Sequence, residues 1–335
     1  MENSIVVIAE HAAGRVRPVT YELITFAKKL QQANLLAIKV FILGADIENL
    51  AREIADKSSL DVMAFEIPEM TVYNGEMFKN VLKEHLPGAH PAYVCVAHTS
   101  QGLDFAPALA VELDAACISG VEDVLIDEQG VCFARPLYGG KIIAHVRPVS
   151  ETSIATIQVG FFKSDMETGQ ASGTVAIQAV STRPQKSRSI GLKQIDSDTA
   201  DITEAKVIVA AGQGIGDKDN LDLVHQLASL FTKSAVAGSR IVCDLGWLEY
   251  RRQVGVTGAT VSPQLYIACG ISGAIQHVTG MRGSEFIVAI NKDPAAAIFQ
   301  VADICIVEDL TTFIPIFIES YRKLRKSVSK LDGTL

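Results

Sequence analysis

The segment LYIACGISGAIQHVTGM, residues 265–281, sets a short apolar run directly before a glycine-containing loop and a helical pattern. The run LYIAC has the length and the continuous apolar character of a strand that is buried on both faces. Similar runs occur at residues 207–211, 286–290 and 303–307. Helical patterns separate the runs, and this alternation predicts a doubly wound parallel α/β sheet in the C-terminal part of the chain.

A glycine-rich or polar loop follows each run: GQGIG at 212–216, GISGAIQH at 270–277, NKDP at 291–294 and EDL at 308–310. In doubly wound sheets, ligands bind at the carboxyl ends of the strands, so these loops are expected along one edge. An ordinary turn explains any single loop, because glycine is the usual turn residue. GQGIG also lacks the G-x-G-x-x-G spacing of the dinucleotide fingerprint. The presence of all the loops on one edge nevertheless favours a nucleotide-cofactor site.

The same region predicts where helices begin. A helix from Ser272 to about Thr279 would direct free N–H groups and its dipole toward an anionic group such as a pyrophosphate. Capping residues precede an amphipathic pattern at 221–231. Asp293 followed by Pro294 is typical of an N-cap with proline in the first helical position.

These segments resemble the FAD domain of the electron-transfer flavoprotein alpha-subunit family, and SGAIQH followed by INKDP is highly specific to it. The matching segments are AVAGSR (235–240), QVGVTG (253–258), LYIACGISGAIQHVTGM (265–281), VAINKDP (288–294) and IFQVAD (298–303). Looser similarity to that family's N-terminal domain lies in IVVIAE (5–10), LDAACISGVEDV (113–124) and FARPLYGGK (133–141). The resemblance therefore covers nearly the whole chain.

The resemblance implies a non-covalent FAD site. Arg240 would lie near the flavin ring, the Thr257 hydroxyl would approach N5, and His277 would lie at the pyrimidine oxygen. A cationic Arg240 and a donor at His277 would favour the reduced ring, which carries negative charge. No catalytic residue and no metal ligand is predicted. The cofactor-binding residues implied are Gln213, Ser239, Arg240, Val254, Gly255, Val256, Thr257, Ser272, Gly273, Ala274, Ile275, Gln276, His277, Asn291, Asp309 and Leu310.

Two positions depart from the family's pattern. The family commonly has arginine where this chain has Gln213, and glutamine where this chain has Val256. Both changes remove polar contacts, so they bear on flavin affinity and on reduction potential.

By resemblance, the chain is an electron carrier rather than a substrate-converting enzyme. It would pair with a beta subunit holding AMP or a second FAD, and carry electrons from flavin dehydrogenases, such as the acyl-CoA dehydrogenases of fatty acid β-oxidation, to an acceptor. Two alternatives remain open. One is an electron-bifurcating complex linked to NADH and ferredoxin, and the other is a nucleotide-binding protein that keeps this fold without redox turnover.

Composition narrows the class of protein. The chain has 335 residues, of which 48% are hydrophobic, and a net charge of −8, which argues against nucleic-acid binding. The basic run at 322–326 ends a predicted helix whose apolar face is Phe313, Phe317, Tyr321 and Leu324, and a solvated helix end is favoured over a partner-docking site. The six cysteines form no C-x-x-C pair and are expected as buried thiols in a reducing cytoplasm. No targeting segment, metal-ligand set or membrane-spanning run is recognisable.

The polar segment at 181–203 predicts a boundary between an N-terminal α/β domain, residues 1–195, and a C-terminal FAD-binding domain, residues 196–335. In the N-terminal domain, strands are predicted at 5–10, 37–44 and 93–98, a helix carries Val19 to Leu30, and hairpins are predicted between 131 and 159. The titratable residues there have no partner motif, so surface or capping roles are favoured for them. They are His98, Asp104 and His145.

Overall fold

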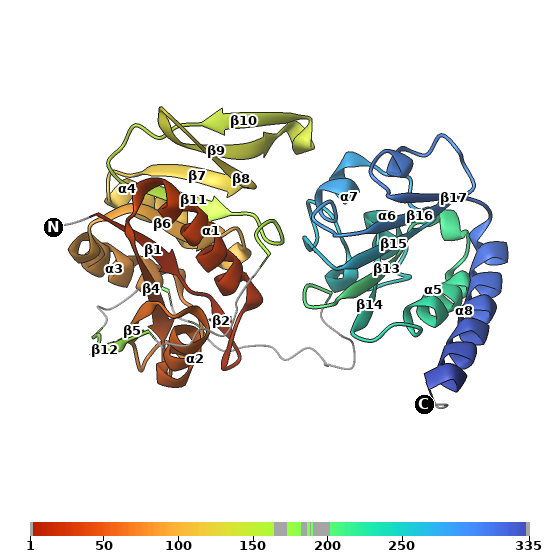
Figure 1. Cartoon of the computed structure of the whole chain (residues 1–335), viewed down its shortest axis with the longest axis horizontal. Helices are drawn as coiled ribbons and strands as arrows, with labels where there is room; N and C mark the ends of the chain where they lie inside the picture. Colours follow the sequence, from red (N-terminus) through yellow and green to blue (C-terminus); the bar gives the residue numbers. More distant parts are fainter. Residues whose placement is uncertain (1–2, 164–172, 182–185, 188, 190–201, 333–335) are drawn as a thin grey trace. The chain divides into compact units, whose positions relative to one another are not determined.

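The computed structural model describes residues 3–163, 173–181, 186–187, 189 and 202–332. The chain divides into two compact units, Met1–Lys193 and Gln194–Leu335, each described by itself (Figure 1). The boundary predicted after residue 195 falls within 190–201, outside the described residues, and stays a prediction.

The N-terminal unit is built on a seven-stranded sheet in which every neighbouring pair is parallel. Strands β1, β4 and β6 confirm the runs predicted at 5–10, 37–44 and 93–98. The order is β12 (Val175–Ala179), β5 (Asp61–Glu66), β4 (Ala37–Gly44), β1 (Ser4–Ile8), β6 (Pro91–Ala97), β11 (Ser153–Ile157) and β7 (Ala116–Val121).

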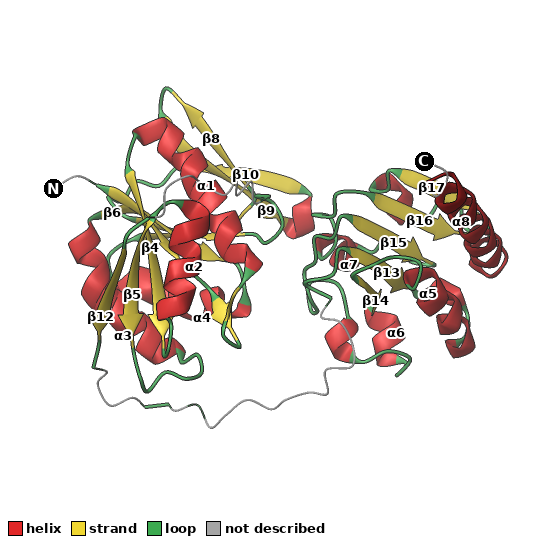
Figure 2. Ribbon diagram, turned by 60° about the horizontal axis from the view of Figure 1, so that its bottom comes forward, coloured by secondary structure: helices red, strands yellow, loops and turns green. Residues whose placement is uncertain are grey.

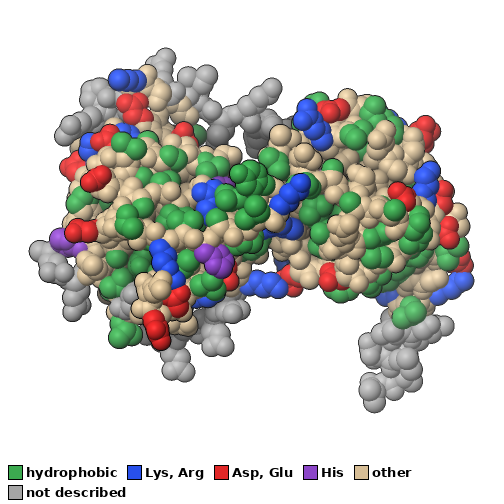
Figure 3. All heavy atoms as spheres, turned by 90° about the horizontal axis from the view of Figure 1, so that it is seen from above, with side chains coloured by type: hydrophobic (Ala, Val, Ile, Leu, Met, Phe, Trp, Pro, Cys, Tyr) green, Lys and Arg blue, Asp and Glu red, His purple; other side chains and the backbone are tan. Residues whose placement is uncertain are grey.

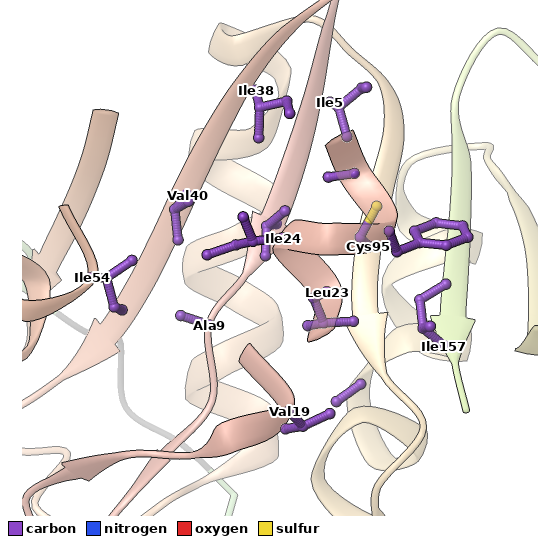
Figure 4. Packing of buried hydrophobic residues seen from close by; sticks show 14 of the residues in the cluster. Ile5, Ala9, Val19, Leu23, Ile24, Ile38, Val40, Ile54, Cys95 and Ile157 are labelled. Atoms are coloured by element: carbon purple, nitrogen blue, oxygen red, sulfur yellow. The ribbon is translucent and has the colours of Figure 1, made fainter. Parts of the chain in front are cut away.

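Helices cover both faces of this sheet (Figure 2). On one face, α1 (Pro18–Asn34) and α2 (Glu48–Ser58) bury their apolar sides against the strands, with Leu23 and Ile24 at the centre (Figure 4). On the other face lie α3 (Gly75–His85) and α4 (Ser100–Glu112). The 3₁₀ turn η1 (Leu86–Ala89) follows α3, and β6 comes between this turn and α4. Burial of both faces explains why the strands are continuous apolar runs.

A three-stranded antiparallel sheet, β8 (Asp123–Asp127), β9 (Gly130–Leu137) and β10 (Ile142–Val146), forms the predicted hairpin region. The turn η2 (Tyr138–Gly140) joins β9 to β10, and hydrophobic side chains gather over this hairpin (Figure 3). The hairpin prediction was wrong for β11, because this fully buried strand pairs in parallel with β6 and β7. A short ladder joins β2 (His11–Ala12) to β3 (Arg15–Val16).

The C-terminal unit contains a five-stranded parallel sheet, which confirms the predicted doubly wound class. All of its predicted runs are strands, with ends that differ by one residue at most. The order is β14 (Ser234–Gly238), β13 (Val207–Ala211), β15 (Leu265–Cys269), β16 (Ile287–Asn291) and β17 (Ile304–Val307). Since β14 and β15 flank β13 on opposite sides, the winding reverses between β13 and β15.

One face of this sheet packs against α5 (Leu221–Ala228) and α8 (Leu310–Asp332). The other face is covered by α7 (Ile275–Thr279) and by loops around Val254, Val261 and Ile298. The short α-helix α6 (Arg240–Asp244) and four 3₁₀ turns complete the described part of the unit: η3 (Gln213–Ile215), η4 (Lys218–Asn220), η5 (Tyr250–Arg252) and η6 (Ala297–Gln300). Among the described residues, no helix combines the length and hydropathy needed to span a membrane.

Three helix predictions need correction. The helix expected from Ser272 begins at Ile275, and Asp293 starts only a turn, in which its carboxylate accepts the Ala295 N–H at 2.9 Å before the 3₁₀ turn η6. The buried face of α8 is Leu310, Ile314 and Ile318 rather than the predicted aromatic face. Phe317 and Leu324 are exposed, whereas Phe313 is half-buried against the same core and its ring stacks on that of Phe317.

Candidate functional site

A cavity of about 940 Å³ lies in the C-terminal unit, among the loops that follow β13, β14, β15 and β16. This is the carboxyl edge of the parallel sheet, next to the point where the winding reverses, and it is where doubly wound sheets bind ligands. Twelve residues implied by the resemblance line it: Gln213, Ser239, Arg240, Val254, Gly255, Val256, Thr257, Ser272, Ala274, Gln276, His277 and Asn291.

Four other residues of the predicted set are not in the cavity wall. Gly273 has a φ of +89°, and a Cβ there would lie 2.1 Å from the Ile298 amide nitrogen, so it packs against the η6 turn. Ile275 is exposed at the first position of α7, and Leu310 is the buried first residue of α8. Asp309 accepts hydrogen bonds from the Thr311 amide and hydroxyl, which hold its pKa below the usual range. Their contact with the cofactor stays a prediction.

Three glycines of the loops after β13 and β15 also line the cavity, although the predicted set of cofactor-binding residues did not include them: Gly212, Gly214 and Gly270. The Gly214 amide donates to the Gly270 carbonyl at 2.9 Å. A Cβ on Gly212 would lie 2.3 Å from the same carbonyl oxygen, so the two loops approach backbone to backbone. The glycine spacing was the signal in the sequence, and close contact between the loops explains it better than a dinucleotide fingerprint does.

Ser239 and Arg240 follow β14 at the mouth of the cavity. Ser239 is the N-cap of α6, but its hydroxyl caps no amide, and the oxygen is buried without a hydrogen-bond partner among the described residues. The Arg240 side chain is 69% exposed, and its Nε lies 3.3 Å from Oδ2 of Asp244. Asp244 also accepts a hydrogen bond from the Tyr250 hydroxyl at 2.9 Å. The guanidinium is thus held at the edge of the cavity by an ion pair in water.

Thr257 is positioned by Gln253, which the predicted set did not include. The Gln253 side chain is only 4% exposed, and its Nε2 donates to Thr257 Oγ1 at 2.8 Å. An oxygen that accepts this bond keeps its own O–H free to donate. Gly255, with a φ of +140°, lets the loop pack against α7, since a Cβ there would lie 2.7 Å from the Gln276 carbonyl oxygen.

His277, like Gln253, is a buried polar residue of the wall, at 6% exposure. Its Nε2 lies 2.9 Å from the hydroxyl of Tyr266, and its Nδ1 has no hydrogen-bond partner among the described residues. Burial lowers the pKa of His277 to about 4, an effect that the Val254 backbone opposes only in part. The imidazole is therefore neutral at pH 7.

Asn291 acts within the protein rather than facing the cavity freely. Its Nδ2 donates to the Ile271 carbonyl at 3.0 Å, and its Oδ1 accepts the Asp293 amide at 3.0 Å. These bonds tie the NKDP loop to the loop after β15. Asp293 and the alanines at 295–297 also line the cavity.

The wall suits a flavin nucleotide. It combines a cation at the mouth, a threonine hydroxyl, a neutral imidazole, glycine backbones and apolar side chains within one concave site. The unpaired Ser239 oxygen and His277 nitrogen are buried polar atoms of the kind that bound ligands satisfy. No group of three or more metal-ligating side chains occurs in the part of the chain that the structure describes.

Known proteins resemble this chain along its whole length. Residues 5–183 match the electron transfer flavoprotein domain, and residues 201–282 match the electron transfer flavoprotein FAD-binding domain. Identity to the electron transfer flavoprotein subunit alpha of Bacillus subtilis is 33% over 325 residues, 97% of this chain and 99% of that protein. Protein FixB of Clostridium saccharobutylicum is 33% identical over 323 residues, 95% of this chain and 96% of its own length. The subunit alpha of Pseudomonas aeruginosa is 34% identical over 316 residues, 93% and 98%.

Proposed function

The chain belongs to the electron transfer flavoprotein alpha-subunit family, and from this premise we propose that it is the FAD-carrying subunit of a heterodimeric electron carrier. It would take electrons from flavin dehydrogenases, such as acyl-CoA dehydrogenases of fatty acid β-oxidation, and deliver them to an acceptor. FAD is the cofactor of this family's C-terminal domain. When bound, the flavin supplies the electron-transfer chemistry, while the protein binds and orients it and tunes its potential.

The observation that carries this proposal is the assembly of the cavity. Loops after four different strands bring twelve of the residues implied by the resemblance into one wall at the reversal point of the sheet. In this proposal the loops after β13 and β15, which their glycines allow to approach backbone to backbone, form the part of the wall that receives the phosphates.

The polar side chains then act on the ring. Thr257, held by Gln253, presents a hydroxyl donor. Arg240 places a positive charge at the mouth of the cavity, where it favours a ring that gains negative charge. Val256, exposed beside these groups, offers an apolar contact and no hydrogen bond.

We also propose the partner and the location. A beta subunit, holding AMP or a second FAD, would pair with this chain. All six cysteines lie in the described residues and are free thiols there, although Cys117 and Cys305 are exposed rather than buried as expected. Free thiols fit the reducing environment of a cytoplasm.

The test is electron transfer by the purified protein, co-expressed with its beta subunit. With an acyl-CoA dehydrogenase and its substrate, the flavin absorption should bleach and then return when an acceptor is added. Bleaching by NADH that depends on ferredoxin would instead identify the bifurcating variant. Bound flavin that responds to neither donor would contradict a redox carrier and favour a nucleotide-binding protein without turnover.

A further inference from the structure

A buried tyrosine stands directly behind the histidine of the cavity wall. Tyr266, on β15, is 0% exposed, and its hydroxyl lies 2.9 Å from His277 Nε2 on α7. The two rings meet edge to face, with centroids 6.2 Å apart. Alternation along β15 turns Tyr266 and Ala268 toward the face that α7 covers, so the hydroxyl reaches the back of the imidazole through the core of the unit.

The direction of this hydrogen bond follows from the surroundings. Tyr266 sits in a cluster of aliphatic residues, where an O–H that donated to nothing would cost about 1–3 kcal/mol. Burial also raises the pKa of Tyr266 well above its usual range, so the phenol keeps its proton. The hydroxyl therefore donates, and Nε2 accepts.

The tautomer of His277 follows in turn. A neutral imidazole carries one N–H, and an Nε2 that accepts from Tyr266 leaves the proton on Nδ1. Nδ1 has no hydrogen-bond partner among the described residues, so its N–H is free to donate to a bound group. Burial is the main cause that lowers the pKa of His277. No charged side chain is among the causes of the shift in that pKa.

We infer that Tyr266 is a positioning residue of the flavin site, which fixes His277 as the neutral Nδ1–H tautomer with a single ring orientation. His277 then acts on the ring through an oriented dipole and contributes no positive charge. This differs from Arg240, whose charge is permanent and exposed. The effect of Tyr266 on the cofactor rests on the proposed function, whereas the tautomer itself does not.

The tautomer can be read directly by nitrogen NMR of the co-expressed heterodimer, labelled with ¹⁵N-histidine and loaded with FAD, with the His277 signals assigned by their loss in His277→Gln. At pH 7 the wild-type protein should show Nδ1 protonated and Nε2 unprotonated. Tyr266→Phe should give a mixture of both tautomers. A wild-type imidazolium, or a proton on Nε2, would overturn the inference without any variant.

The cofactor gives a second readout. Tyr266→Phe should weaken FAD binding about fivefold, which corresponds to roughly 1 kcal/mol at 1.4 kcal/mol per tenfold. The matched control is Tyr73→Phe, which removes a phenol bonded to Asp104 at 2.8 Å in the N-terminal unit and should leave FAD binding unchanged. Equal effects of the two variants, or none from Tyr266→Phe, would show that Tyr266 does not position the site. Failure of electron transfer with the Nδ1–H signal intact would count against the proposed function alone.

Discussion

At the scale of single residues, Gln213 and Val256 both depart from the family's pattern and both lie in the cavity wall. Gln213→Arg should add a charge-assisted hydrogen bond and tighten FAD binding by about tenfold, or roughly 1.4 kcal/mol. Flavin fluorescence titration measures the dissociation constant. Gln129→Arg, at an exposed position of the N-terminal unit, is the matched control for added charge. An unchanged dissociation constant in Gln213→Arg would exclude this position from contact with FAD.

Substitution of Arg240 tests how the charge at the mouth of the cavity affects the flavin potential. Arg240→Ala should lower the one-electron potential of the flavin, because the reduced ring loses a nearby positive charge. The shift should be on the order of 60 mV or less, at about 59 mV per tenfold, since an exposed charge is screened by water. Spectroelectrochemical titration gives the potential. As a control, Arg52→Ala removes a comparable exposed ion pair, with Glu48, and should leave the flavin potential unaltered. A shift of the potential in both variants would rule out a local effect of Arg240.

At the scale of elements, the loop after β15 depends on Gly270. Its φ is +65°, and a Cβ would lie 2.6 Å from the carbonyl carbon of Gly214. Gly246 has a similar φ of +69°, but a Cβ there would meet nothing within 4 Å. Gly270→Ala should therefore destabilise the protein by about 1–3 kcal/mol more than Gly246→Ala does, through overpacking. Denaturant unfolding measures the stability of the two variants. Equal losses of stability would mean that the close approach of the loops adds no cost beyond the backbone strain.

Helix α1 contains a partly buried carboxyl group, that of Glu22, which makes the stability of the protein depend on pH. Glu22 Oε2 accepts the Gly160 amide at 2.5 Å, and burial raises the pKa of Glu22 to about 7. Because the unfolded carboxyl titrates near its ordinary value of about 4.3, the folded state holds an extra proton between these pH values. Stability should fall as pH rises from about 4.5 to 7. Glu22→Gln should flatten this part of the profile, measured by urea unfolding at several pH values, and an unaltered slope would assign it to another group.

At the scale of the whole molecule, we expect the chain to depend on its partner. Expressed alone, it should be poorly stable or aggregate, because binding of a second subunit stabilises the folded state by mass action. Co-expression with the beta subunit should give a flavin-loaded heterodimer by light scattering. Acid precipitation of that heterodimer should release all the flavin, since the predicted contacts are non-covalent. A flavin-loaded monomer that stays stable and does not aggregate would contradict this dependence on the beta subunit.

Local sequence determined those strands that are continuous apolar runs. The runs at 207–211 and 265–269 became strands with the predicted ends, because continuous apolar segments of that length can be buried only between two layers of helix and loop. The doubly wound class followed from their alternation with helical patterns. The glycine-rich loops and the twelve residues of the wall could also be named in advance, from spacing and from resemblance.

Tertiary contacts decided the remaining features. The helix predicted from Ser272 begins only at Ile275, because Gly273 packs against the η6 turn. Strand β11 belongs to the parallel sheet because it pairs with β6 on one side and β7 on the other. The partners behind the wall, Gln253 for Thr257 and Tyr266 for His277, come from pairing between side chains that no periodic pattern marks. Hydrophobic periodicity encodes which residues are buried, whereas the identity of a buried group's partner depends on how the segments meet in space.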